Sequence, residues 1–69
     1  MNLPKLLQRD LTTEYLGSHQ NHEGVRRYSV YVQGPLSRTI PEYYSDYVGG
    51  VREAKREALA SWRTNGLIQ

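Results

Sequence analysis

The chain has 69 residues, nine of them lysine or arginine and seven aspartate or glutamate, which gives a formal net charge of +2 and a pI of about 9.2. A chain this short forms one small domain, residues 1–69, and buries only about 60% of its unfolded surface, so its core is thin and a deep active-site cleft is excluded. It has no cysteine, which excludes disulfides and thiolate metal sites.

The N-terminal segment, residues 2–11, is predicted to form a short helix. Asn2 is suited to the N-cap position, and Pro4 is tolerated in the first helical turn. Lys5 and Arg9 lie together on the polar side of this helix. The apolar stripe that defines its other side consists of leucines at helical spacing: Leu3, Leu6, Leu7 and Leu11.

Three strands are expected next. Residues 12–17 predict the first, residues 18–24 a polar turn, and residues 25–33 the second strand, which Gly34-Pro35 ends. Alternation divides the second strand into two faces. One face carries Tyr28, Val30 and Val32, and the other carries Arg27, Ser29 and Tyr31.

Residues 36–48 are harder to assign. Residues 36–40 are compatible with a continued hairpin that Pro41 would break, and residues 42–48 predict a third strand. Alternation within that strand means that Tyr44 cannot share a face with Tyr43, so part of the tyrosine cluster must point away from the core.

The last third of the chain predicts an amphipathic helix over residues 50–64, opened by Gly49-Gly50 and closed by Asn65-Gly66. Its side chains are sorted by type. The apolar face carries Val51, Ala54, Ala58 and Trp62; the basic stripe carries Arg52, Arg56 and Arg63; the acidic side carries Glu53 and Glu57. A basic stripe beside a helix N-terminus suits a phosphate, whereas the plainer interpretation is a solvated helix face.

The element order is therefore α-β-β-β-α. It predicts an α+β domain with a three-stranded antiparallel sheet and two helices packed on one face.

This pattern resembles the double-stranded-RNA-binding domain. The element order is similar. The spacing of Tyr15 and Tyr28 around a histidine-containing loop is also similar, and the segment Val51 to Leu59 resembles the family's Lys-Lys-x-Ala-Lys helix. Val51 stands where that motif has its first lysine. Plant-type and phage-type β-sheet DNA-binding domains, and the arm-binding domains of tyrosine recombinases, end in comparable helices and remain open as alternatives.

The resemblance implies double-stranded RNA as the partner, bound by shape through phosphates and minor-groove 2′-hydroxyls. Arg52 and Lys55 match motif lysines and would clamp phosphates, with help from Arg56 and from the backbone N–H groups after Gly50. The remaining implied contacts are in the two minor grooves: His22 with His19 in one, and Lys5, Gln8 and Arg9 in the other.

Two other functions stay open. If the ligand is duplex DNA, the sheet would carry the contacts through Arg27, Ser29 and Tyr31 in the major groove. Alternatively, the chain is a protein-interaction or inhibitor module, of phage or virus type, or a homodimer. Its interface would then be the edge strand at residues 42–48 or the helix that carries Trp62.

An enzyme is not expected, because no catalytic constellation is visible and no cofactor is implied. His19 and His22 with Glu23 lack a third good metal ligand, so no metal is expected. Trp62 is expected in the core. The chain has no apparent signal peptide or membrane-spanning stretch, which favours an intracellular location, cytoplasmic or nuclear, and the initial Met1 favours a complete small protein.

Overall fold

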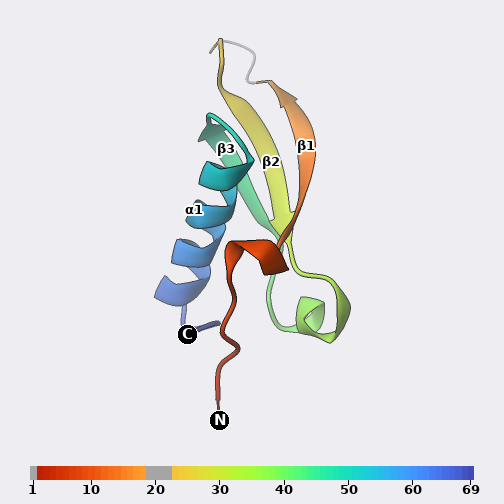
Figure 1. Ribbon diagram of the computed structural model, residues 1–69, viewed down its shortest axis with the longest axis vertical. Helices are drawn as coiled ribbons and strands as arrows, with labels where there is room; N and C mark the ends of the chain where they lie inside the picture. Colours follow the sequence, from red (N-terminus) through yellow and green to blue (C-terminus); the bar gives the residue numbers. More distant parts are fainter. Residues whose placement is uncertain (1, 19–22) are drawn as a thin grey trace.

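The structure is a computed structural model that describes residues 2–18 and 23–69. It contains a three-stranded antiparallel sheet, with strand order β1-β2-β3, and one α-helix against one face of the sheet (Figure 1). The elements are β1 (Thr12–Ser18), β2 (Arg26–Tyr31), β3 (Tyr43–Val48) and α1 (Val51–Thr64). Two short 3-10 helices complete the described chain: η1 (Gln8–Asp10) and η2 (Gly34–Arg38). The α+β class and the sheet are confirmed, but the order is β-β-β-α.

The predicted N-terminal helix is wrong. Residues 2–7 have no regular secondary structure, and only the three residues of η1 turn, at the end of the segment. The leucine stripe is divided accordingly, because Leu6 and Leu11 are buried in the core whereas Leu3 and Leu7 are 39% and 46% exposed. The sheet therefore carries one α-helix on its face, and the second α-helix that the sequence predicted is not present within the described residues.

Competing backbone bonds explain this difference. The C-terminal residue lies alongside the N-terminal segment, where the Gln69 backbone N–H donates to the Pro4 carbonyl at 2.9 Å and its side-chain amide donates to the Leu3 carbonyl at 2.8 Å. An isolated ten-residue helix is marginal in water, since nucleation is costly. A segment that also satisfies its carbonyls by pairing with the C-terminal tail gains more from staying extended.

Alternation along β2 places the core as the sequence predicts. Tyr28 and Val30 face α1 and are 8% and 0% exposed, while Arg27 and Tyr31 belong to the opposite, outer face of the sheet. Both neighbouring strands carry a register shift, between Tyr15 and Gly17 in β1 and opposite Arg26 to Tyr28 in β3. Such irregularities increase local twist. The β1–β2 hairpin extends beyond the start of α1 in Figure 1.

The core is formed where α1 crosses β2 and β3. Its helix side consists of Ala54, Ala58, Leu59 and Trp62, and the small alanines allow the helix to approach the sheet closely. Trp62 is 2% exposed, and its indole Nε1–H donates to the Pro41 carbonyl at 3.0 Å. The prediction that this tryptophan packs in the core is confirmed.

The end of α1 follows a Schellman arrangement. The Leu67 N–H donates to the Trp62 carbonyl at 2.9 Å and the Gly66 N–H to the Arg63 carbonyl at 3.0 Å. Gly66 has φ of 72°, a left-handed conformation that glycine adopts without steric cost. The turn returns the chain toward the core, where Ile68 is buried. The predicted Asn65-Gly66 cap is confirmed.

Candidate nucleic-acid interface

The acidic side chains of α1 contact other parts of the protein, whereas its arginines face away from the sheet. Glu53 accepts a hydrogen bond from the Gly49 backbone N–H at 2.9 Å, just before the helix begins. Glu57 accepts from the Ser45 hydroxyl at 3.0 Å and from the Tyr43 hydroxyl at 3.4 Å, both on β3. Both acidic side chains of the helix are therefore turned toward the protein and away from the exposed face.

The arginines of α1 remain on that exposed face. Arg52, Arg56 and Arg63 are all exposed, and their spacing places them along one side of the helix, away from the sheet. Arg63 donates to the Gln69 carbonyl at 2.9 Å. Within residues 2–18 and 23–69, no ion pair joins Arg52 or Arg56 to a carboxylate. We call Arg52, Arg56 and Arg63 the basic face of α1.

Lys55 is half-buried and lies nearer the apolar side of the helix than the three arginines do. Its position suits an alkyl stem that packs on the core with the ammonium at the surface. The structure therefore places Lys55 beside the basic face rather than within it.

One further cation meets the start of α1, and the sequence did not single it out. Arg26 is exposed, lies opposite Val48 in the sheet, and donates from Nη1 to the Gly49 carbonyl at 2.9 Å. The guanidinium is thereby held at the turn between β3 and α1. Only the pairing of β2 with β3 brings this residue to the helix, because Arg26 and Gly49 are 23 positions apart.

The helix N-terminus itself already has a carboxylate close to it. Gly50 is the N-cap, has extended backbone and contributes no side-chain cap. The Glu53 carboxylate, held at the Gly49 N–H, supplies the negative charge that the first turn favours. A phosphate at the N–H groups after Gly50 would have to share the site with Glu53, so the arginines are the stronger part of this interface.

The predicted N-terminal contacts lie elsewhere. Lys5 and Arg9 are exposed and Gln8 is half-buried, and Arg9 is 4.0 Å from the Asp10 carboxylate. Figure 1 shows η1 beside the C-terminal half of α1, whereas Arg52 is in its first turn. The structure therefore does not bring these residues together with the start of the helix. The loop histidines, His19 and His22, lie outside the described residues.

The outer face of the sheet, proposed above for DNA contacts, carries carboxylates. Ser29 is 1% exposed and its hydroxyl donates to Glu42. The Tyr44 hydroxyl donates to the same carboxylate at 2.7 Å. Arg27 donates to the Leu16 carbonyl at 3.3 Å. Glu42 was not among the residues predicted for a site, and the only sequence signal for it was its position as the first residue of the predicted third strand, residues 42–48.

Hydrogen bonds and burial shift the pKa values of Glu42, Tyr44 and Tyr43. Donation from Ser29, and then from Tyr44, lowers the pKa of Glu42 below its ordinary value, so that this carboxylate stays ionised. The hydrogen bond to Glu42 raises the pKa of Tyr44. Burial, followed by the Glu57 charge, raises the pKa of Tyr43.

Tyr43 and Tyr44 divide as the alternation predicts: Tyr43 is half-buried on the helix side, whereas Tyr44 is 58% exposed on the outer face. Strict alternation would place Tyr47 with Tyr43, but Tyr47 is 62% exposed, because the register shift of β3 lies between Ser45 and Val48. The outer edge of β3 has no partner strand within the described sheet. This exposed edge is the feature that a protein-interaction function would use.

No group of three histidine, cysteine, aspartate or glutamate side chains within residues 2–18 and 23–69 is arranged to hold a metal ion. Nor does this part of the chain contain a helix with the length and apolar character needed to cross a membrane. No protein family, curated protein or solved structure matches the chain.

Proposed function

We propose that the protein binds duplex nucleic acid through its phosphate backbone, using the basic face of α1 together with Arg26. The observation that supports this proposal is the separation of charge on α1. Both glutamates of the helix are engaged at backbone or β3 hydroxyl groups, while Arg52 and Arg56 have no carboxylate partner among the described residues.

Arginine suits this role because its planar guanidinium donates two hydrogen bonds to one phosphate and does not lose its charge. Arg52 and Arg56 are one helical turn apart and would repel each other slightly in the free protein. A polyanion removes that repulsion, so the arrangement favours the bound state.

The chemistry is shared by RNA and DNA duplexes. The resemblance to double-stranded-RNA-binding domains favours RNA, but the helix that would enter one minor groove in that mode is not formed. We therefore expect backbone contacts with weak sequence preference, and a preference for RNA only if the remaining surface fits the A-form groove.

The test is a fluorescence-anisotropy titration of the protein against a 20-base-pair RNA duplex and the matching DNA duplex at several salt concentrations. Each phosphate contact contributes about 0.9 to the slope of log affinity against log salt for a B-DNA duplex. The double variant Arg52→Gln/Arg56→Gln should reduce that slope by about 2 and weaken both duplexes alike.

The control is Arg38→Gln, which removes an exposed arginine from η2, a segment that lies level with the C-terminal end of α1 and away from its start (Figure 1). It should leave the slope nearly unchanged. A control effect half as large as that of the double variant, which removes twice the charge, would show non-specific attraction to net charge. Absence of binding to either duplex at low salt would contradict the proposal.

A second candidate is a homodimer formed at β3. The observation that favours it is the unpaired outer edge of that strand in the described sheet, next to the exposed ring of Tyr44. Sedimentation equilibrium distinguishes the two functions. A dimer formed through the edge of β3 should weaken when proline replaces Asp46, which lies between Ser45 and Tyr47 in that strand. If the protein were monomeric at all concentrations, the homodimer would be contradicted and duplex binding would be the remaining proposal.

A further inference from the structure

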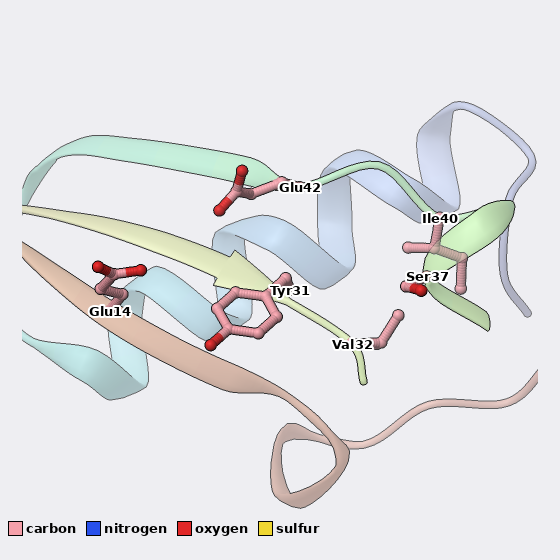
Figure 2. Close-up of a pocket in the computed structure, with 6 residues that line it drawn as sticks. All are labelled: Glu14, Tyr31, Val32, Ser37, Ile40 and Glu42. Atoms are coloured by element: carbon pink, nitrogen blue, oxygen red, sulfur yellow. The ribbon is translucent and has the colours of Figure 1, made fainter. Parts of the chain in front are cut away.

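A hollow of about 280 Å³ lies on the outer face of the sheet, the face that α1 does not cover (Figure 2). Its walls come from β1, from β2 and from the connection between β2 and β3. It is lined by Glu14, Tyr31, Val32, Ser37, Ile40 and Glu42. Figure 2 shows the two carboxylates and the tyrosine ring at one end and the smaller side chains at the other.

The two carboxylates lie on the same face of the sheet but come from the two sides of its central strand, β2. Glu14 on β1 lies opposite Ser29 on β2, and Glu42 immediately precedes β3. Neighbouring strands are about 4.8 Å apart, so the backbones that carry the two glutamates are separated by about 10 Å. Side chains of this length, leaning over β2 from both sides, leave room for one planar cationic group between them.

One of these carboxylates is fixed as an anion. Glu42 accepts hydrogen bonds from Ser29, which is 1% exposed, and from Tyr44. Both donors hold its oxygens over the sheet. Glu14 is exposed, and within the described residues no cation is paired with it. The hollow therefore carries two negative charges that no cation within residues 2–18 and 23–69 neutralises.

The rest of the hollow is suited to an alkyl chain. Ile40 and Val32 are each 3% exposed and form an apolar end. The Tyr31 ring is half-buried between this end and the carboxylates. A cation placed over an aromatic ring is attracted to the negative face of the ring.

We propose that this hollow binds an arginine side chain presented by a partner protein. The guanidinium lies between Glu14 and Glu42 and stacks on Tyr31, and the methylene stem lies against Ile40. Arginine fits better than lysine, because its five donors are arranged in a plane and can serve two carboxylates at once. Phosphates are excluded by the same two charges, so this surface is separate from the duplex-binding face and does not depend on it.

A metal ion is a poorer occupant. Hard divalent cations take six or more oxygen ligands, and two carboxylates with a tyrosine do not supply them. An apolar end would also contribute nothing to such an ion, whereas it covers the stem of an arginine.

The experiment is an amide ¹H–¹⁵N NMR titration of the full chain with the tripeptide acetyl-Ala-Arg-Ala-amide. The control ligand is the same peptide with citrulline, which keeps the shape of arginine and removes its charge. Shifts are expected at Ser29, Tyr31 and Glu42 with the arginine peptide, and weaker or absent shifts with citrulline. Equal shifts with both peptides, or shifts confined to other parts of the chain, would overturn the proposal.

Two variants then locate the binding. Glu14→Gln and Glu42→Gln each remove one charge-assisted partner and should weaken the arginine peptide about tenfold. The matched control is Glu23→Gln, which removes an exposed carboxylate outside the hollow and should change the affinity by less than twofold. Glu14→Gln removes no hydrogen bond that the described structure makes, so this variant is expected to fold like the parent protein. If Glu23→Gln lowered the affinity for the arginine peptide as much as Glu14→Gln does, the proposal of a defined site would be refuted.

Discussion

Glu57 on α1 accepts a hydrogen bond from the hydroxyl of Ser45 on β3, and Ser45 is 1% exposed. A small polar residue under the helix thus gives an acidic side chain of α1 a partner inside the protein. Glu57 lies next to Arg56 and five residues after Arg52, spacings at which helical side chains do not face each other, so this contact leaves both arginines of the basic face without a carboxylate neighbour from Glu57.

Replacing Glu57 with alanine should destabilise the fold. The Ser45 hydroxyl would lose its acceptor while remaining buried, which typically costs about 1–3 kcal/mol in the free energy of unfolding. Urea denaturation monitored by circular dichroism measures this change. In a double-mutant cycle with Ser45→Ala, the double variant should be less destabilised than the sum of the single variants; strict additivity would show that the contact contributes nothing.

Replacing Trp62 with phenylalanine should cost about 2 kcal/mol or more, since it leaves the Pro41 carbonyl without its donor and creates a small cavity. Urea denaturation of the variant and of the parent protein measures this change in the free energy of unfolding. Ser61→Ala, at the neighbouring half-buried position, is the control and should be nearly neutral. A stable phenylalanine variant would mean that the indole hydrogen bond adds little.

The two glycines at the ends of α1 should respond with opposite signs. Gly66→Ala forces an L-residue into φ of 72° and should destabilise the protein by about 1 kcal/mol. Gly50→Ser leaves the extended N-cap conformation unstrained and adds a capping hydroxyl, which should stabilise by a few tenths of a kcal/mol. Thermal unfolding compares the two; a loss of stability in both would indicate that Glu53 already fills the capping role.

Stability should decline at high pH through Tyr43. Its pKa is raised in the folded protein, by burial and by Glu57, so the unfolded chain loses the tyrosine proton first as pH rises. The contribution is complete below the ordinary tyrosine pKa of about 10 and is lost as pH rises through the folded value. Denaturation from pH 8 to 11 should show a shallower decline for Tyr43→Phe, and parallel declines would contradict this assignment.

The sheet and α1 could be predicted because their patterns are local. Alternation along residues 25–33 identifies Tyr28 and Val30 as core residues without knowledge of the partner strands, and the helical spacing of Ala54, Ala58 and Trp62 does the same for α1. The basic face follows from the same spacing.

The N-terminal segment could not be predicted in this way. Its leucine spacing fits a helix, but its conformation depends on Gln69, which is 66 residues away from Leu3 in the chain. Arg26 at the start of α1 and the Ser29–Glu42 contact were missed for the same reason. Each depends on which strands pair and in which register, and residue spacing within one segment does not contain that information.

The bonds from Gln69 to Leu3 and Pro4 place both ends of the described chain at one pole of an elongated molecule that measures 43 Å along its longest axis. Figure 1 shows this pole opposite the β1–β2 hairpin. A short peptide joining residue 69 to residue 2 would therefore close the chain into a ring without moving the sheet. Cyclisation would lower the entropy of the unfolded chain, and a label tethered to the join would remain distant from both Arg26 and the first turn of α1.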